Sequence, residues 1–470
     1  MKTLLLYCGL ISYSLFAQAE QIELKLSETG TGLDHTVIIE SPGMFKLGFE
    51  NGLNYGLSQW FDLVNDPQAK VDISHNYTDY LSAHAQGALF NQCLNPDDLI
   101  GHVASAKLHF KDTPRSIKII ESGPVRVIVE NSYHPMLGKQ NKTLLFNTRY
   151  VIYPTGKMFI KNIFTALKPQ TITLWRNSIL GVGDPAYSLN ADKGIIELTE
   201  KNVLTDKTKK WKLNQWKGYQ ITLPGWNSFE IAANTETTIT VGKQLSGGKP
   251  LSSGEYTIST QRTKYGWLRG DSVKFPKTWH NKSSDFILAC WDKTTPKPYS
   301  EWTKASVMLT PFPNNPKQGG GAGLHGWSGY KRTYYEYGKF EMKQDEKITQ
   351  YYMINLGAEN SEFLPNIISK EIAKTYADDY RQPVILKNGE FSKQNGCYIL
   401  NNHKIDFDAA GIERIYPVFQ LTGNSTPKVK LNNAKLQEGK DYISQINKNN
   451  QVIVQILRKL SNKNTLEFSF

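Results

Sequence analysis

Apolar and polar residues alternate along most of this chain, and the alternation is clearest in the segment 123–164. Val125, Val127 and Val129 occupy every second position there, the period that is typical of a strand with one buried face. Residues 154–157 then carry a turn signal, because proline presets φ and glycine accepts positive φ values. We therefore predict long antiparallel strands joined by tight turns in this segment.

The second strand of this segment has two faces of different character. Its apolar face is expected to hold Leu144, Phe146, Tyr150 and Ile152, and its polar face Asn147, Arg149 and Tyr153. Strands of this length are typical of a large sheet, and the polar outer face makes such a sheet ready to bind a ligand.

Similar strand patterns continue from residue 21 to about residue 347, with Gly, Pro, Asn and Asp at the breaks. Many short strands separated by turn residues are typical of all-β sandwiches. Helical patterns are few. The segment 97–106 is one candidate, and the segment 366–381 is the stronger one because its apolar residues recur at helical spacing after a proline. We predict an all-β fold class.

Three stretches of the sequence resemble the β-supersandwich of galactose-mutarotase-like proteins. They are GPVRV at 123–127, the aromatic-rich strand that ends in the YPTGK turn at 153–157, and NYGLSQWFDL at 54–63. The resemblance is to versions of this fold that serve polysaccharide lyases and other carbohydrate-active enzymes. It implies a large antiparallel β-supersandwich and a carbohydrate-active enzyme.

These patterns divide the chain into four parts. We predict a signal peptide at 1–19, a β-supersandwich catalytic domain at 20–365, a helical linker at 366–383 and a small C-terminal β-sandwich domain at 384–470. The last part has a length typical of small domains. It resembles the small β-sandwich of many secreted carbohydrate-active enzymes, and we expect it to have a structural role.

The beginning of the chain has the pattern of a secretory signal peptide. A short positive region at 1–3 precedes an apolar region at 4–16 and the A-x-A cleavage signal Ala17-Gln18-Ala19. No later stretch offers the ~18 consecutive apolar residues of a membrane-spanning helix. We expect a secreted or periplasmic protein with no membrane insertion.

The chain is basic, with a formal net charge of +12. Such a charge favours an anionic partner through long-range electrostatics, although plain solubility would also explain it. The basic residues are scattered, with one local cluster at 207–210, whereas a nucleic-acid arm or a polybasic membrane segment is more concentrated. We predict an acidic polysaccharide as the partner and no nucleic acid.

The cysteines and metal motifs exclude some classes. Cys93, Cys290 and Cys397 remain after the predicted cleavage, so at most one disulfide can form. The sequence has no CxxC, no HExxH and no credible zinc spacing. We predict no cofactor and no catalytic metal.

Two groups of residues fit the chemistry of uronate β-elimination, which needs a cation to neutralise the carboxylate, a base for the α-proton and an acid for the leaving oxygen. The predicted catalytic residues are His84, His134, Arg149, Tyr153, His325, Tyr330 and Arg332. For each of them a structural role is the alternative, since a lone histidine or tyrosine is common in any sheet.

Other residues pair an aromatic ring with a guanidinium or an amide, which suits a sugar that carries an acid group. The predicted substrate-binding residues are Asn91, Trp175, Arg176, Trp267, Arg269 and Trp327. A core tryptophan beside a solvated arginine is the alternative.

We predict a secreted polysaccharide lyase that cleaves a uronic-acid-containing polymer by β-elimination. Carboxylates such as Asp62, Asp184 and Glu336 are present, but no spacing marks a facing pair of the kind that glycosidases use. A glycoside hydrolase or an epimerase on the same fold stays open as an alternative, and so does a glycan-binding protein without catalysis.

Overall fold

A computed structural model describes residues 22–63, 68–69, 89–94, 115–134, 144–172, 174–183, 192–225, 227–259, 265–269, 278–281, 287–291, 305–311, 321–327, 330–337, 340–355 and 377–470. The predicted signal peptide and the predicted helix at 97–106 lie outside these residues. Within them the regular structure is almost entirely β, which confirms the predicted fold class. Residues 377–381 form a short α-helix at the end of the segment 366–381, and residues 366–376 lie outside the described part.

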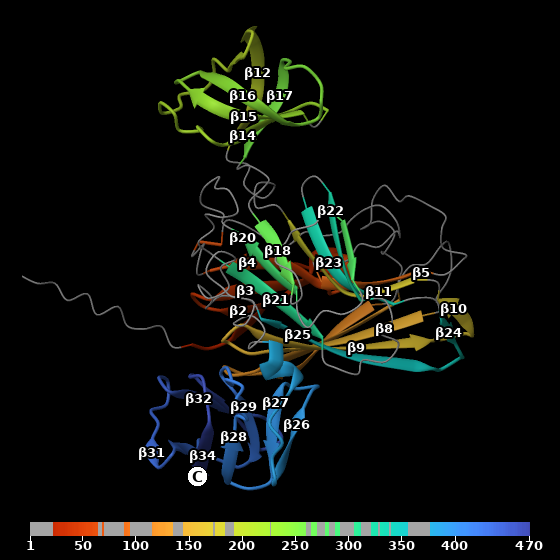
Figure 1. Cartoon of the computed structure of the whole chain (residues 1–470), viewed down its shortest axis with the longest axis vertical. Helices are drawn as coiled ribbons and strands as arrows, with labels where there is room; N and C mark the ends of the chain where they lie inside the picture. Colours follow the sequence, from red (N-terminus) through yellow and green to blue (C-terminus); the bar gives the residue numbers. More distant parts are fainter. Residues whose placement is uncertain are drawn as a thin grey trace, which may run out of the picture.

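Two large antiparallel sheets form the main body (Figure 1). In spatial order, the nine-stranded sheet contains β1 (Lys25–Thr29), β2 (Thr36–Ser41), β3 (Phe45–Glu50), β4 (Leu57–Asp62), β5 (Leu89–Leu94), β11 (Leu174–Gly183), β23 (Tyr330–Tyr337), β22 (Gly321–Trp327) and β19 (Thr278–Asn281). The eight-stranded sheet contains β18 (Tyr265–Arg269), β20 (Ile287–Trp291), β21 (Ala305–Pro311), β25 (Lys347–Asn355), β9 (Lys157–Ala166), β8 (Leu144–Ile152), β7 (Val127–Tyr133) and β6 (Arg115–Ser122).

Smaller elements accompany these sheets. Strands β10 (Gln170–Ile172) and β24 (Phe340–Met342) pair with each other, and the 3-10 turns η1 (Gly32–Asp34) and η2 (Asn51–Leu53) flank β2 and β3. No helix of the described residues is long and apolar enough to cross a membrane.

The alternation of residues in β8 explains how the two sheets pack. Leu144, Phe146, Tyr150 and Ile152 are all buried, so the predicted apolar face is confirmed. They share one core cluster with residues of the nine-stranded sheet such as Leu47 and Trp60. Burial of this apolar area is the main stabilising term of the sandwich.

Buried polar residues cross this core in register. Asn131, Thr148, Asn162 and Gln350 lie opposite one another on β7, β8, β9 and β25. Asn131 donates from Nδ2 to the carbonyl oxygen of Tyr55 at 2.8 Å and accepts from the Thr148 amide at 3.2 Å. Since a buried amide needs partners, these contacts fix the turn after η2 against the eight-stranded sheet.

Residues 192–259 form a closed barrel. Along the chain it follows β11 of the nine-stranded sheet and precedes β18 of the eight-stranded sheet. In order around the barrel it contains β12 (Asp192–Glu200), β13 (Val203–Thr205), β16 (Thr238–Ser246), β15 (Asn227–Asn234), β14 (Gln220–Leu223) and β17 (Gly254–Ser259). It has its own apolar core, which includes Trp211, Trp216 and Ile231. The sequence predicts strands here but not their closure into a separate unit, which Figure 1 shows standing apart from the two large sheets.

The C-terminal part is a small sandwich with its own core. One sheet contains β26 (Gly389–Ser392), β27 (Cys397–Leu400), β29 (Val418–Thr422), β33 (Gln451–Ile456) and β32 (Tyr442–Ile446). The other contains β28 (Lys404–Asp408), β34 (Lys463–Ser469), β30 (Lys428–Leu431) and β31 (Ala434–Lys435).

A buried arginine joins this small sandwich to the eight-stranded sheet. Arg126 forms an ion pair with Glu121 at 2.8 Å and donates from Nη1 to Oε1 of Gln420 at 2.9 Å. Gln445 accepts from the Arg126 backbone amide at 2.8 Å and donates to Glu121 at 2.7 Å. The side chain of Arg126 is 2% exposed, so its charge depends on these partners.

We expect Arg126→Met to lower the free energy of unfolding by about 3 kcal/mol, because it leaves the partly buried Glu121 without its cation. Lys430→Met is the matched control. Lys430 forms an exposed ion pair with Glu467 at 3.4 Å, and its loss should cost less than about 1 kcal/mol. Urea denaturation of both variants measures the difference, and equal losses would contradict a stabilising role for this junction.

Candidate functional site

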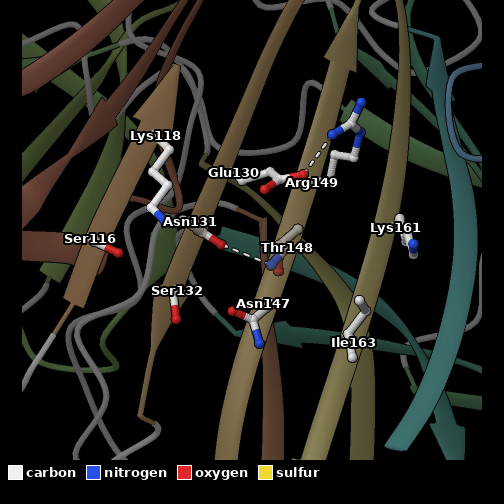
Figure 2. A pocket seen from close by; sticks show the side chains of 10 residues that line it. All are labelled: Ser116, Lys118, Glu130, Asn131, Ser132, Asn147, Thr148, Arg149, Lys161 and Ile163. Carbon is white, nitrogen blue, oxygen red and sulfur yellow. Dashed lines mark hydrogen bonds and ion pairs between the residues drawn. The ribbon is translucent and has the colours of Figure 1, made fainter. Parts of the chain in front are cut away.

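A pocket of about 330 Å³ lies on the outer face of the eight-stranded sheet (Figure 2). It is lined by Ser116, Lys118, Glu130, Asn131, Ser132, Asn147, Thr148, Arg149, Lys161 and Ile163. These residues come from the four adjacent strands β6, β7, β8 and β9. The pocket therefore rests on hydrogen-bonded sheet rather than on loops, which keeps its groups in fixed positions.

Charged residues form a row across this pocket, one from each strand. Lys118 lies opposite Glu130, Glu130 opposite Arg149, and Arg149 opposite Lys161. Tyr351 of β25 is the next member of the row, opposite Lys161. A neighbouring row of Ser116, Ser132 and Asn147 supplies hydroxyl and amide groups.

The row carries more positive than negative charge. Arg149 binds Glu130 through Nη1 at 2.6 Å, with 15% and 39% of the two side chains exposed. Glu130 is the acidic residue in the lining, while Lys118, Arg149 and Lys161 are all cationic. Such an excess of positive charge in a partly enclosed cavity favours an anionic ligand.

The turn between β26 and β27 of the C-terminal sandwich contacts two cationic residues of the pocket. Asn395 accepts at Oδ1 from Nη2 of Arg149 at 3.2 Å, and Gln394 accepts at Oε1 from Nζ of Lys161 at 2.6 Å. Gly396, with φ of 63°, lies so close to the ring of Phe159 that a Cβ there would approach it to 2.1 Å. The turn can dock this closely only because position 396 is glycine.

Lys161 is chemically distinctive within the row. Its partial burial lowers its pKa, and the neighbouring positive charge of Arg149 lowers it further, while Glu130 acts in the opposite direction. A lowered pKa raises the fraction of the amine that is neutral at a given pH, and the neutral form can accept a proton.

Tyr153 follows β8 and shares the face of Arg149, as the alternation predicts. It is fully buried, however, and its hydroxyl donates to the carbonyl oxygen of Asn395 at 2.6 Å. Burial raises the pKa of this hydroxyl well above its usual value. This placement argues against the predicted catalytic role for Tyr153, because the group is shielded from substrate and stays protonated.

His134 lies at the end of β7, outside the pocket lining. Its Nδ1 donates to the carbonyl oxygen of Leu144 at 2.9 Å, which ties the end of β7 to the start of β8. His84 lies outside the described residues, so its predicted role stays a prediction.

Most other predicted site residues lie on the nine-stranded sheet, where the backbone register groups them. His325 lies opposite Arg332, and Trp327 lies opposite Tyr330. Residues two apart on a strand share a face, so these four positions share one face of the sheet.

The same register shows which face this is. Leu57, which is buried in the core, lies opposite Leu89, so Gln92 of β5 is on the outer face. Arg176 lies opposite both Gln92 and Glu336. By alternation along β23, the outer face therefore holds Arg176, Glu336 and the group around His325.

The remaining predicted substrate-binding residues are not brought to this face. Trp175 and Asn91 neighbour Arg176 and Gln92 along their strands, so they fall on the opposite face. Trp267 and Arg269 lie on β18, the edge strand of the other sheet. Among the predicted residues, Arg149 thus lies in the pocket of the eight-stranded sheet. A second group lies together on one face of the nine-stranded sheet and consists of His325, Tyr330, Arg332, Trp327 and Arg176.

No sequence motif marked Lys118, Glu130, Lys161 or Tyr351 as site residues. The signal was available in the alternation of β6 and β9, which places Lys118 and Lys161 on the polar face. Their convergence on Arg149 depends on the register between strands, which alternation within one strand does not specify. The described residues contain no group of three or more His, Cys, Asp or Glu side chains arranged to hold a metal ion.

No known family model and no curated protein matches the sequence. Solved structures match at low similarity. A protein assigned as a mutarotase from Salmonella typhimurium matches with a TM-score of 0.34 and 10% identity, over 71% of this chain and 93% of that one. A galactose 1-epimerase from Lactobacillus acidophilus matches with a TM-score of 0.26 and 9% identity, over 71% of this chain and 98% of that one.

A polysaccharide lyase matches over 95% of this chain and 46% of that one, with a TM-score of 0.23 and 7% identity. The matches thus include both classes of protein that the sequence resembles. At this similarity they identify neither a reaction nor a substrate.

We expect Tyr153→Phe to lower the free energy of unfolding by about 1 kcal/mol, the usual contribution of one hydrogen bond. The pH dependence of any catalysed reaction should stay unchanged, because the raised pKa keeps this hydroxyl protonated. Chemical denaturation and a pH profile of the variant check this. A loss of activity without a loss of stability would restore a catalytic role for Tyr153.

Proposed function

We propose that the protein is an enzyme that cleaves an acidic polysaccharide by β-elimination in the pocket of the eight-stranded sheet. The observation that carries this proposal is the row in which Arg149 lies directly opposite Lys161. Arg149 is a permanent cation. Lys161 is an amine, and both its burial and the charge of Arg149 lower its pKa. Elimination next to a carboxylate needs such a pair.

The steps follow from the chemistry of the row. Arg149 neutralises the uronate carboxylate, with Lys118 adding positive charge, so that the α-proton at C5 becomes acidic. Neutral Lys161 takes this proton, the C5–H electrons form the C4=C5 double bond, and the bond between C4 and the glycosidic oxygen breaks. Tyr351, next in the row, gives a proton to the leaving oxygen.

The contacts of Arg149 support its role as the carboxylate ligand. Its Nη1 and Nη2 are held by Glu130 and Asn395, which orients the guanidinium. Each of these two nitrogens carries a second N–H, and this pair would donate to a ligand carboxylate.

The predicted signal peptide at 1–19 supports a place outside the cytoplasm, where polysaccharides are met. The net charge of +12 supports an acidic substrate. We propose a secreted or periplasmic enzyme on these grounds.

The test is the ultraviolet absorbance of the unsaturated uronate, followed over time with alginate, ulvan, glucuronan, chondroitin, hyaluronan and pectate. We expect one polymer to give a rising signal, and kcat/KM to rise with pH as Lys161 loses its proton. Lys161→Arg keeps the positive charge but replaces the amine by a guanidinium that stays protonated and cannot act as a base, so turnover should fall at least ~100-fold. Binding of the polymer should persist.

Lys428→Arg is the matched control, because Lys428 is exposed on β30 of the C-terminal sandwich, outside the pocket. It should leave turnover unchanged. Full activity of Lys161→Arg would contradict the assignment of the base, and silence across the polymer panel would contradict the lyase proposal.

An epimerase or a glycoside hydrolase is the second candidate, and one observation favours it. The outer face of the nine-stranded sheet holds His325, Arg332 and the carboxylate residue Glu336 in register. An enzyme of either kind would depend on such a carboxylate.

If this face carries the reaction, Glu336→Gln should abolish activity while Lys161→Arg has no effect. New reducing ends without ultraviolet absorbance would mark a hydrolase, and altered anomeric exchange of a free sugar would mark an epimerase. The lyase proposal predicts the opposite result, in which Lys161→Arg loses activity and Glu336→Gln keeps it.

A further inference from the structure

The closed barrel carries a basic loop that the proposed reaction does not use. The loop spans residues 206–219 between β13 and β14, and five lysines but no acidic residue occur at 207–219. Lys207, Lys210, Lys212 and Lys217 are all exposed.

The loop is held firmly in spite of its length. Trp211 and Trp216 anchor it in the barrel core, with 7% and 8% exposure. Asn234 accepts from the Trp216 amide at 2.7 Å and donates to the carbonyl oxygen of Lys212 at 2.9 Å. The Trp211 amide also donates to the carbonyl oxygen of Glu236 at 2.8 Å. The lysines therefore project from a fixed backbone, which lowers the entropic cost of binding.

Two acidic residues beside the loop, Asp192 and Asp206, are already engaged. Asp192 pairs with Lys209 at 2.7 Å and accepts from Nε1 of Trp211 at 2.6 Å. Asp206 accepts from Thr208 and from the hydroxyl of Tyr256. Lys209 is thus neutralised, whereas the four exposed lysines face solvent with Glu236 as the exposed acid of the adjoining turn.

We propose that this loop docks a polyanionic glycan chain, at a distance from the pocket. A polymer is favoured over a lipid surface because the loop exposes a single large apolar residue, Leu213, at 75%. Insertion into a membrane interface needs a broad apolar face. The inference rests on the proposed acidic substrate and adds that this substrate is a long chain.

Docking at a second site raises the affinity for chains that reach both sites and leaves short oligosaccharides unaffected. The barrel stands apart from the sheets in Figure 1, so only a polymer can bridge the two. Binding at the loop should also weaken steeply with salt, as contacts between lysines and a polyanion do.

The test uses the full chain with Lys207, Lys210, Lys212 and Lys217 all changed to Gln. We expect its retardation on gels that contain the polymer cleaved by the wild type to fall at least about tenfold. Cleavage of short oligosaccharides should keep its kcat and KM. The control variant changes Lys428, Lys435, Lys440 and Lys448 to Gln, which removes the same charge from exposed positions of the C-terminal sandwich.

An equal loss in both variants would show a mere charge effect and overturn the proposal. Loop-dependent binding to phosphatidylserine vesicles, without binding to the polymer, would also overturn the proposal. Gel retardation with alginate or hyaluronan measures binding by the loop even if no polymer is cleaved. Failure of the lyase proposal and failure of loop docking are therefore distinguishable. Lys212→Glu alone is the second variant and should weaken retardation in the same direction.

Discussion

The alternation of residues along β6, β7, β8 and β9 is the constraint on which the rest of the structure depends. Strands β7 and β8 bury one face in the core that they share with the nine-stranded sheet, and their other face is left for polar groups. Because the register between the strands is also fixed by the core, Lys118, Glu130, Arg149 and Lys161 become neighbours in space. The pocket is thus a consequence of how the core packs.

The C-terminal sandwich completes this arrangement from outside. Asn395 contacts both Arg149 and Tyr153, and the close approach of Gly396 to Phe159 sets the turn against the sheet. The buried ion pair of Arg126 with Glu121 holds the same junction at another point. A domain expected to be purely structural therefore orients two charged groups of the pocket, which links the stability of the junction to the chemistry of the site.

Alternation within single strands was enough to predict the all-β class, the buried face of β8 and the common face of Arg149 and Tyr153. It could not show that the C-terminal turn would bury Tyr153, because that contact joins residues far apart in the sequence. It also gave no sign that residues 192–259 close on themselves, since barrel closure depends on strand order and not on period. Lys161 was missed because alternation places it on the polar face of β9 but does not show that it lies opposite Arg149.

The most direct test is a crystal structure of the Lys161→Arg variant with a uronate oligosaccharide bound. We predict that the uronate carboxylate lies within hydrogen-bond distance of the Arg149 guanidinium, with C5 of the sugar facing position 161. A sugar bound on the outer face of the nine-stranded sheet, near His325 and Glu336, with nothing in the pocket, would contradict it.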